Sequence, residues 1–256
     1  MGLLRKYLYG ALFLFAVMIF LVHYTISGQA VYGDGIGYYS HLHSWVIDGD
    51  WDYTNEYKHI HDAEHNNADT GVESPVVQIV SVSPSGKAEN LYGTGVAILL
   101  LPFFILAHGM SLLANIFGAG LSTQGYGDIY QIFTGLGAIA YTIAGVYFLE
   151  KTIYIVIRNK VISLISSLTI FLATSLLYYG SFDVINSHFA SFFLSSIFFY
   201  LFLGRNEKTK NDLVLGFLAG LLTINRIQDG AVVLLWLVDA WRKATLSFKT
   251  AGKFAV

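Results

Sequence analysis

Long apolar segments alternate with short polar ones along this chain of 256 residues. The first apolar stretch covers residues 7–26 and follows two basic residues. It has about the ~20 residues that a helix needs to cross ~30 Å of hydrocarbon. A cleaved signal peptide is the alternative, but its apolar core would span only ~7–15 residues. We therefore predict an uncleaved first transmembrane helix within residues 1–26.

Further apolar stretches cover residues 93–116, 129–149, 161–179, 188–203, 213–224 and 231–240. Basic residues cluster between these stretches, at 5–6, 151–160, 205–210 and 242–253. The positive-inside rule places every such cluster in the cytoplasm, so an even number of crossings must join neighbouring clusters. Three stretches separate the first two clusters, and one of them therefore does not cross. We assign residues 93–116, which contain Pro102 and His108, to a juxtamembrane or re-entrant helix on the outer face.

The last two apolar stretches form a short hairpin. A helical arm of ~12 residues is only ~18 Å long, so we expect the polar tip at 225–229 to lie within the membrane, facing protein or water. The fold class expected is all-α: a polytopic transmembrane helix bundle of about six crossings. Residues 27–128 form a large extracytoplasmic first loop carrying juxtamembrane helices. Residues 129–256 form the other transmembrane helices, expected to be incomplete at the C-terminal end.

The composition supports a membrane location and limits the chemistry. Hydrophobic residues make up 55% of the chain and charged residues 12%, which excludes an ordinary soluble domain and makes the lipid bilayer a partner. The chain has no cysteine, so disulfides, thiolate metal sites and cysteine nucleophiles are excluded. The net charge is −2 and the basic residues flank apolar stretches, so we expect no nucleic-acid partner. The N-terminus is expected in the cytoplasm.

A glycine-rich motif follows the first helix, with the sequence Gly33-Asp34-Gly35-Ile36-Gly37-Tyr38-Tyr39. Flanking glycines allow a tight bend and leave the Asp34 carboxylate uncovered at the membrane surface. A general base acting on a lipid-borne substrate has to lie there. The alternative is that Asp34 caps the N-terminus of the next helix, a common role of aspartate.

A histidine-rich run contains His59, His61 and His65 together with interspersed carboxylates. Imidazole and carboxylate groups can bind zinc or another divalent metal. The spacing fits no defined ligand template, and a solvated polar loop explains the same composition. The sequence therefore assigns no cofactor and leaves a divalent metal open.

Two polar motifs lie near the ends of later helices. Asp183, Ser187 and His188 are ingredients of a hydrolytic triad, but neighbouring residues on a helix point about 100° apart and cannot align as nucleophile and base. Capping by Asp183 or Ser187 is the alternative, and His188 remains a ligand-contact candidate. Arg226, with Gln228, lies at the hairpin tip, where a charge is costly unless it serves a function. Its guanidinium matches a phosphate; an internal salt bridge to Asp229 or snorkelling is the alternative.

The order of these features resembles bacterial membrane glycosyltransferases of the GT-C class, the relatives of protein mannosyltransferases and of the lipid A aminoarabinose transferase. The resemblance rests on the first helix and on the motifs at 33–39, 46–52, 93–108, 186–188 and 225–230. It covers nearly the whole chain and corresponds to about the N-terminal half of such enzymes. It implies a protein of the bacterial inner membrane that transfers a hexosyl or pentosyl group from a polyprenyl-phosphate sugar donor to a glycan, lipid or protein acceptor on the extracytoplasmic face.

The resemblance also implies roles for particular residues. Asp34 would be the catalytic carboxylate, and Arg226 would hold the departing carrier phosphate. The same cavity would be lined by Gln228, His188, Tyr38 and Tyr39. Asp34 is followed by glycine, whereas the commoner family pattern has glutamate, so a second acid would come from elsewhere, with Asp48 or Asp50 as candidates.

A multi-pass transporter or lipid-binding membrane protein is the competing interpretation. In that case Arg226 and the interrupted hairpin would form a substrate site like the broken helices of secondary transporters. The large outer loop favours the enzyme, because transporters usually hold their ligand near the middle of the bilayer.

Overall fold

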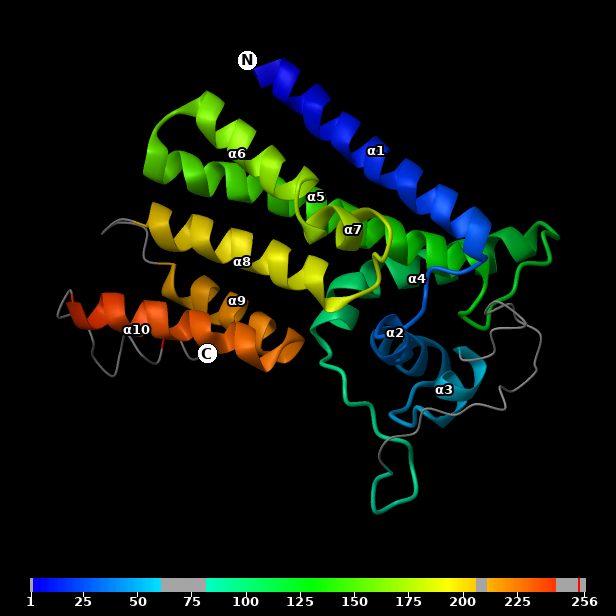
Figure 1. Ribbon diagram of the computed structural model, residues 1–256. Coiled ribbons are helices and arrows are strands. Elements are labelled where there is room, and N and C mark those ends of the chain that lie inside the picture. The colour runs from blue at the N-terminus through cyan, green and yellow to red at the C-terminus, as the bar shows by residue number, and fades with distance from the viewer. Residues whose placement is uncertain (1, 61–81, 206–210, 243–252, 254–256) are drawn as a thin grey trace.

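The computed structural model describes residues 2–60, 82–205, 211–242 and 253. These residues form ten α-helices (Figure 1) and no strand apart from an isolated bridge between Val82 and Ala88. The all-α prediction is confirmed. The helices are α1 (Gly2–Ser27), α2 (Gly35–His43), α3 (Thr54–Ile60), α4 (Gly95–Ile116), α5 (Asp128–Ile157), α6 (Lys160–Leu172), α7 (Ser175–Ser181), α8 (Ser187–Gly204), α9 (Asp212–Asn225) and α10 (Val232–Arg242), with a π-turn η1 (Ser44–Asp48) and a 3₁₀ turn η3 (Ile227–Ala231).

Four of the helices in the described ranges, α1, α4, α5 and α8, are long and apolar enough to cross a membrane. A fifth span results if α6 and α7, which are bent by 71° at their junction, count as one. The sequence predicted an unbroken stretch there, over 161–179. By contrast, α9 and α10 have 14 and 11 residues, or ~21 and ~17 Å of helix, which matches the short hairpin expected.

Helix α1 shows how the bundle divides its side chains between protein and membrane. Its buried residues recur every four positions and pack toward α5: Leu12, Ala16, Phe20 and Tyr24. Large apolar residues on its other side are exposed: Leu14, Met18, Val22 and Ile26. A continuous apolar stripe of this kind is unfavourable in water and favourable in lipid, so the exposed face suits a helix at the bilayer boundary.

Helix α5 is the centre of the bundle and packs against α1, α4, α6 and α8. Its N-terminal end holds the chain that follows α1. The Gln131 side chain accepts a hydrogen bond from the Ala30 N–H (2.8 Å) and donates one to the Tyr126 carbonyl (2.9 Å). The Tyr24 hydroxyl donates to Asp128 at 2.6 Å. These bonds fix the position at which residues 28–60 leave the bundle.

Helix α4 runs unbroken through Pro102. Its contacts lie at one end of the bundle. Gly95 packs on Asn225, the last residue of α9, and the His108 Nδ1 lies 2.7 Å from the hydroxyl of Tyr130, near the start of α5. The assignment of this segment to a helix along the membrane surface stays a prediction, since its length and hydropathy are those of a membrane span.

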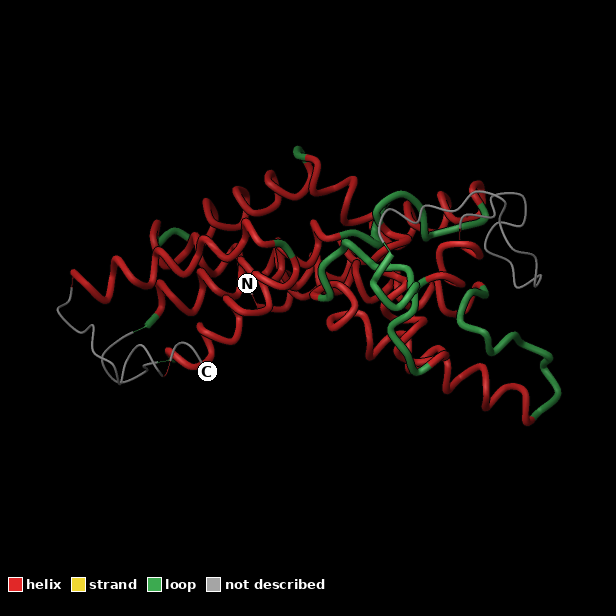
Figure 2. The backbone as a smooth tube through the Cα atoms, turned by 90° about the horizontal axis from the view of Figure 1, so that it is seen from below, coloured by secondary structure: helices red, strands yellow, loops and turns green. Residues whose placement is uncertain are grey.

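We call the end of the bundle that carries α2, η1 and α3 the Asp34 end, and the opposite end, where α1 begins, the Lys6 end. The α2–α3 lobe, residues 35–60, sits beside the bundle at the Asp34 end (Figure 1). Figure 2 shows that the longer loops gather toward this side of the molecule. The polar side chains of the connecting segments therefore gather at the Asp34 end.

Candidate functional site

Asp34 lies between a glycine turn and helix α2. Gly33 adopts a left-handed conformation (φ 55°), which glycine tolerates without strain. Asp34 occupies the N-cap position of α2, as the capping alternative predicted, but its side chain makes no capping hydrogen bond. The carboxylate instead accepts a hydrogen bond from the Tyr92 hydroxyl at 3.1 Å, and Asp34 is exposed. This carboxylate is therefore available to a ligand.

The glycines after Asp34 allow two distant segments to pack against α2. A Cβ atom on Gly35 would lie 2.7 Å from the Ile185 carbonyl oxygen, and one on Gly37 would lie 1.9 Å from the Tyr92 ring. The Asn90 amide also donates to the Gly37 carbonyl at 2.6 Å. The motif thus allows the segments around residues 92 and 185 to pack closely on α2 next to Asp34.

Asp183 is the carboxylate that the fold brings near Asp34. It is half-buried, and burial together with the negative charge of Asp34 raises its pKa to about 6. Sequence analysis suggested Asp48 or Asp50 as the second acid, and the structure places both elsewhere. No local sequence pattern could have revealed that Asp183 lies near Asp34, because this proximity depends on how the segment between α7 and α8 packs against α2.

The segment before α8 is held by Asn186. Its side-chain oxygen accepts hydrogen bonds from the N–H groups of His188 (2.7 Å) and Phe189 (3.4 Å), and its amide donates to the Asp183 carbonyl. Asn186 therefore caps α8, rather than Asp183 or Ser187 as the sequence suggested. The His188 ring stacks on Tyr179 with 3.9 Å between centroids, which fixes the imidazole at the start of α8.

The hairpin tip is anchored to α8 while Arg226 keeps its charge available. Asp229 accepts a hydrogen bond from Ser191, and the Asn225 amide donates to the same hydroxyl at 2.8 Å. With the Gln228 amide oxygen turned toward it, the Arg226 guanidinium donates to that oxygen through Nε (2.8 Å) and Nη2 (3.1 Å). Within the described ranges Arg226 makes no ion pair, so the salt bridge to Asp229, which was the alternative interpretation, does not form there.

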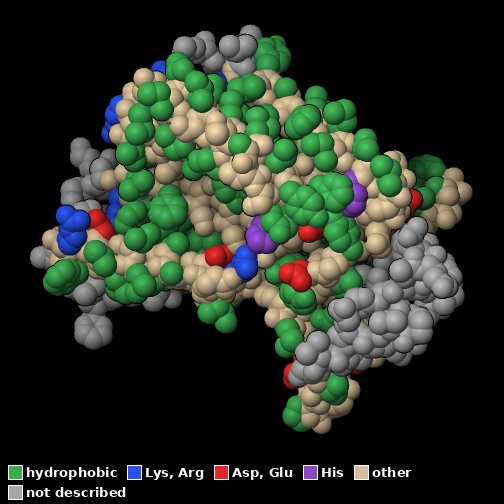
Figure 3. Space-filling view, in the orientation of Figure 1, with side chains coloured by type: hydrophobic (Ala, Val, Ile, Leu, Met, Phe, Trp, Pro, Cys, Tyr) green, Lys and Arg blue, Asp and Glu red, His purple; other side chains and the backbone are tan. Residues whose placement is uncertain are grey.

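Electrostatic interactions show that these residues share one region. Burial raises the pKa of Tyr38, the charges of Asp34 and Asp229 raise it further, and Arg226 lowers it. The same three charges act on His188. We call Asp34, Asp183, His188, Arg226 and Asp229 the Asp34 cluster. Figure 3 shows acidic, basic and histidine side chains gathered on one face between the helix bundle and the lobe.

The predicted site residues Tyr39, Asp48 and Asp50 make their contacts away from the Asp34 cluster. Tyr39 is a core residue whose hydroxyl donates to the Gly125 carbonyl at 2.6 Å, so it does not line a cavity with Asp34. Asp48 accepts from Asn55 at 2.9 Å, and Asp50 accepts from Ser44 at 3.0 Å. Both acids belong to the α2–α3 lobe.

The structure does not describe the side chains of the predicted histidine-rich metal site. His59 lies in α3 without a described side chain, and His61 and His65 lie outside the described residues.

Tyr92 contacts Asp34, and the sequence analysis did not single it out. Nothing in the pattern around residue 92 marks it, because its contact with Asp34 spans 58 positions of the chain.

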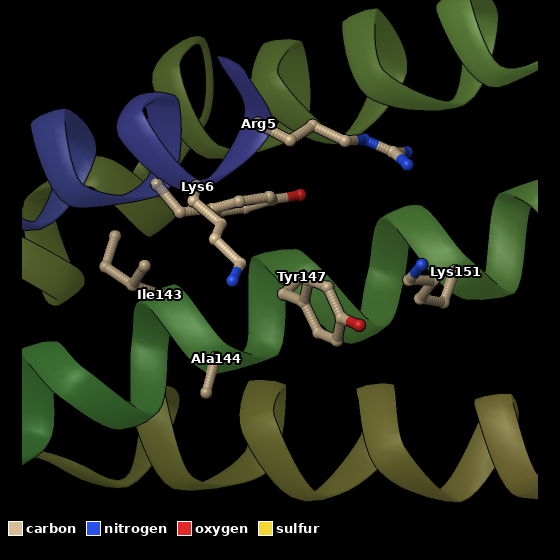
Figure 4. Close-up of a pocket in the computed structure, with 7 residues that line it drawn as sticks. Arg5, Lys6, Ile143, Ala144, Tyr147 and Lys151 are labelled. Atoms are coloured by element: carbon tan, nitrogen blue, oxygen red, sulfur yellow. The ribbon is translucent and has the colours of Figure 1, made fainter. Parts of the chain in front are cut away.

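A separate cavity of about 570 Å³ lies between α1 and α5 at the Lys6 end (Figure 4). Its lining residues are Arg5, Lys6, Tyr9, Ile143, Ala144, Tyr147 and Lys151. Arg5 pairs with the fully buried Glu150, which also accepts a hydrogen bond from Tyr9 at 2.6 Å. Residues 10–27 of α1, ~27 Å of helix, lie between this cavity and the segment that carries Asp34. It is not part of the Asp34 cluster.

No family model, characterised protein or solved structure matches this chain. Its chemistry therefore has to be inferred from the Asp34 cluster itself.

Proposed function

We propose that this protein is an integral-membrane glycosyltransferase that moves a sugar from a polyprenyl-phosphate carrier to an acceptor at the Asp34 end. The observation that carries the proposal is the presence in one region of an exposed carboxylate, Asp34, and a half-buried arginine, Arg226, that has no ion-pair partner within the described residues. Both charges act on Tyr38 and on His188. A base and a phosphate-binding cation are the two groups that this transfer requires.

The proposed reaction uses one proton transfer and one displacement. The acceptor hydroxyl gives its proton to the Asp34 carboxylate while its oxygen forms a bond to the anomeric carbon. The bond between that carbon and the phosphate oxygen breaks, and its electron pair leaves with the carrier phosphate. Arg226 stabilises the negative charge that develops on this phosphate. The Tyr92 hydroxyl, 3.1 Å from Asp34, orients the carboxylate for the proton transfer.

Gln228 and His188 complete the donor side of the proposed site. Gln228 holds the guanidinium through two donors, Nε and Nη2, so that the other N–H groups stay available for a phosphate. His188, fixed by stacking on Tyr179, supplies a ring nitrogen that can contact a sugar hydroxyl. Tyr38 is buried and feels the charges of both Asp34 and Arg226. The second carboxylate of the site is Asp183.

The proposed orientation follows from the distribution of basic residues. Arg5, Lys6 and Lys151 lie at the Lys6 end, which the positive-inside rule assigns to the cytoplasm. The Asp34 end then faces the outside of the bacterial inner membrane, where a polyprenyl-phosphate donor and a glycan, lipid or protein acceptor can meet. A transporter would instead be expected to hold its ligand near the bilayer midplane.

Donor binding tests the proposal. We would incubate purified protein in detergent with polyprenyl-phosphate sugars and measure bound lipid by native mass spectrometry. We expect the wild type and Asp34→Asn to bind, Arg226→Gln to lose at least tenfold in affinity, and Arg242→Gln, which removes an exposed arginine at the end of α10, to bind like the wild type. Failure of the wild type to bind any such donor, or full binding by Arg226→Gln, would contradict the proposal.

A further inference from the structure

A second polar cluster lies inside the α2–α3 lobe. His43 of α2, Asp48 of η1 and Glu56 of α3 each present one ligand atom, and these three atoms lie within 4.8 Å of one another. His43 and Glu56 are buried, whereas Asp48 lies at the surface. None of these residues belongs to the Asp34 cluster, and the proposed transfer does not use them.

The hydrogen bonds of His43 determine which way its lone pair points. Its Nε2 lies 2.7 Å from the Gln124 carbonyl oxygen, which can only accept, so Nε2 carries the proton in the neutral ring. Nδ1 then presents a lone pair to the Asp48 and Glu56 carboxylates, each 3.1 Å away. Stacking on Tyr126, with 4.1 Å between centroids, holds the ring in this orientation. Three electron-pair donors thus face one another.

Glu56 leaves one buried oxygen of the cluster without a partner. Its side chain is fully buried, and its Oε2 atom has no hydrogen-bond partner. A buried carboxylate with an unpaired oxygen is costly unless a cation compensates it. A proton or a metal ion between the three ligand atoms would do so.

We propose that His43, Asp48 and Glu56 bind a divalent transition-metal ion of the zinc type. An imidazole ligand favours zinc over magnesium or calcium, which prefer all-oxygen sites. Donation of the other ring N–H to a carbonyl is the usual support of a metal-bound histidine. The exposed Asp48 side chain gives the ion an entry path from solvent. The ion would tie α2, η1 and α3 together, and these ligands differ from the histidine-rich run at 59–65.

Zinc titration of the full chain tests this site. We would strip the purified protein with a chelator, add Zn²⁺, and follow binding by calorimetry and the melting temperature in parallel. We expect one tight equivalent and a raised melting temperature. Glu56→Gln, which keeps the side-chain shape, and the surface substitution Asp48→Asn should each lose more than tenfold in affinity, because each removes an anionic ligand.

Two controls separate this site from other histidines. His41→Gln removes a buried histidine of the same helix whose ring nitrogens contact the Tyr53 hydroxyl and the Tyr92 carbonyl, and it should leave zinc affinity unchanged. Combined replacement of His59, His61 and His65 by alanine should do the same. The proposal is overturned if the wild type binds no zinc, if Asp48→Asn binds as tightly as the wild type, or if the triple replacement abolishes binding. Asp48→Asn decides the outcome if Glu56→Gln does not fold.

Discussion

Replacing Gly37 by alanine is expected to lower the free energy of unfolding, because the added methyl group would clash with the Tyr92 ring. The added Cβ would lie 1.9 Å from a ring carbon, whereas carbon atoms in contact are ~3.5–4.0 Å apart, so the ring must retreat by roughly 2 Å. Overpacking of this kind costs about 1–3 kcal/mol. The retreat also breaks the hydrogen bond from Tyr92 to Asp34, with a net contribution of about 1 kcal/mol. We expect a total loss of about 2–4 kcal/mol.

A double-mutant cycle measures whether the ring is the cause. The free energy of unfolding would be determined in detergent for Gly37→Ala, Tyr92→Ala and the double variant. Once the ring is absent, the added methyl group meets no clash, so Gly37→Ala should then cost less than about 1 kcal/mol. Gly109→Ala is the matched control, since this helical glycine of α4 has no atom within 4 Å of a new Cβ, and it should be neutral or stabilising. An equal loss with and without the Tyr92 ring would refute the reasoning.

Other substitutions test the remaining parts of the site and the bundle. The raised pKa of Asp183, about 6 against an ordinary 3.8, means that its contribution favours folding at low pH and is lost as the pH rises through 6. Asp183→Asn should therefore raise the melting temperature at pH 8 and change it little at pH 4; equal shifts would contradict this. Asn186→Ala should cost about 1 kcal/mol of unfolding free energy in denaturant titrations, because α8 loses its cap. Arg5→Ala should cost about 3–5 kcal/mol, because it leaves the buried Glu150 uncompensated, while Lys6→Ala should cost under ~0.5 kcal/mol; similar losses for both would contradict the buried pair.

The apolar segments could be predicted from the sequence because each was long enough to specify a helix by itself. The first helix, the α8 segment and the short hairpin arms all form close to their predicted bounds. The sequence analysis missed the break between α6 and α7, because the residues there, Ala173 and Thr174, are neither glycine nor proline. The position of α4 could not be derived from hydropathy, since the same apolar residues suit a membrane span and a helix packed across the bundle end.

The candidate site could be predicted only where local rules decide it. Asp34 is exposed, as its flanking glycines predicted, while the roles of Asp34 and Arg226 stay predictions. The partner acid depends on tertiary packing, which brings Asp183 and not Asp48 toward Asp34. Tyr39 was expected beside Tyr38, but successive residues of α2 point in different directions, and Tyr39 faces the core. The His43 cluster joins residues from three successive elements of the lobe, which no spacing rule describes.

Sugar transfer by the Asp34→Asn variant tests the central claim most directly. Labelled sugar on a polyprenyl-phosphate carrier would be supplied to membranes that contain the wild type, Asp34→Asn or Asp50→Asn, with membrane insertion checked for each. We predict transfer by the wild type and by Asp50→Asn, and a loss of at least 100-fold in Asp34→Asn with donor binding retained. Transfer by Asp34→Asn at the wild-type rate would contradict the account.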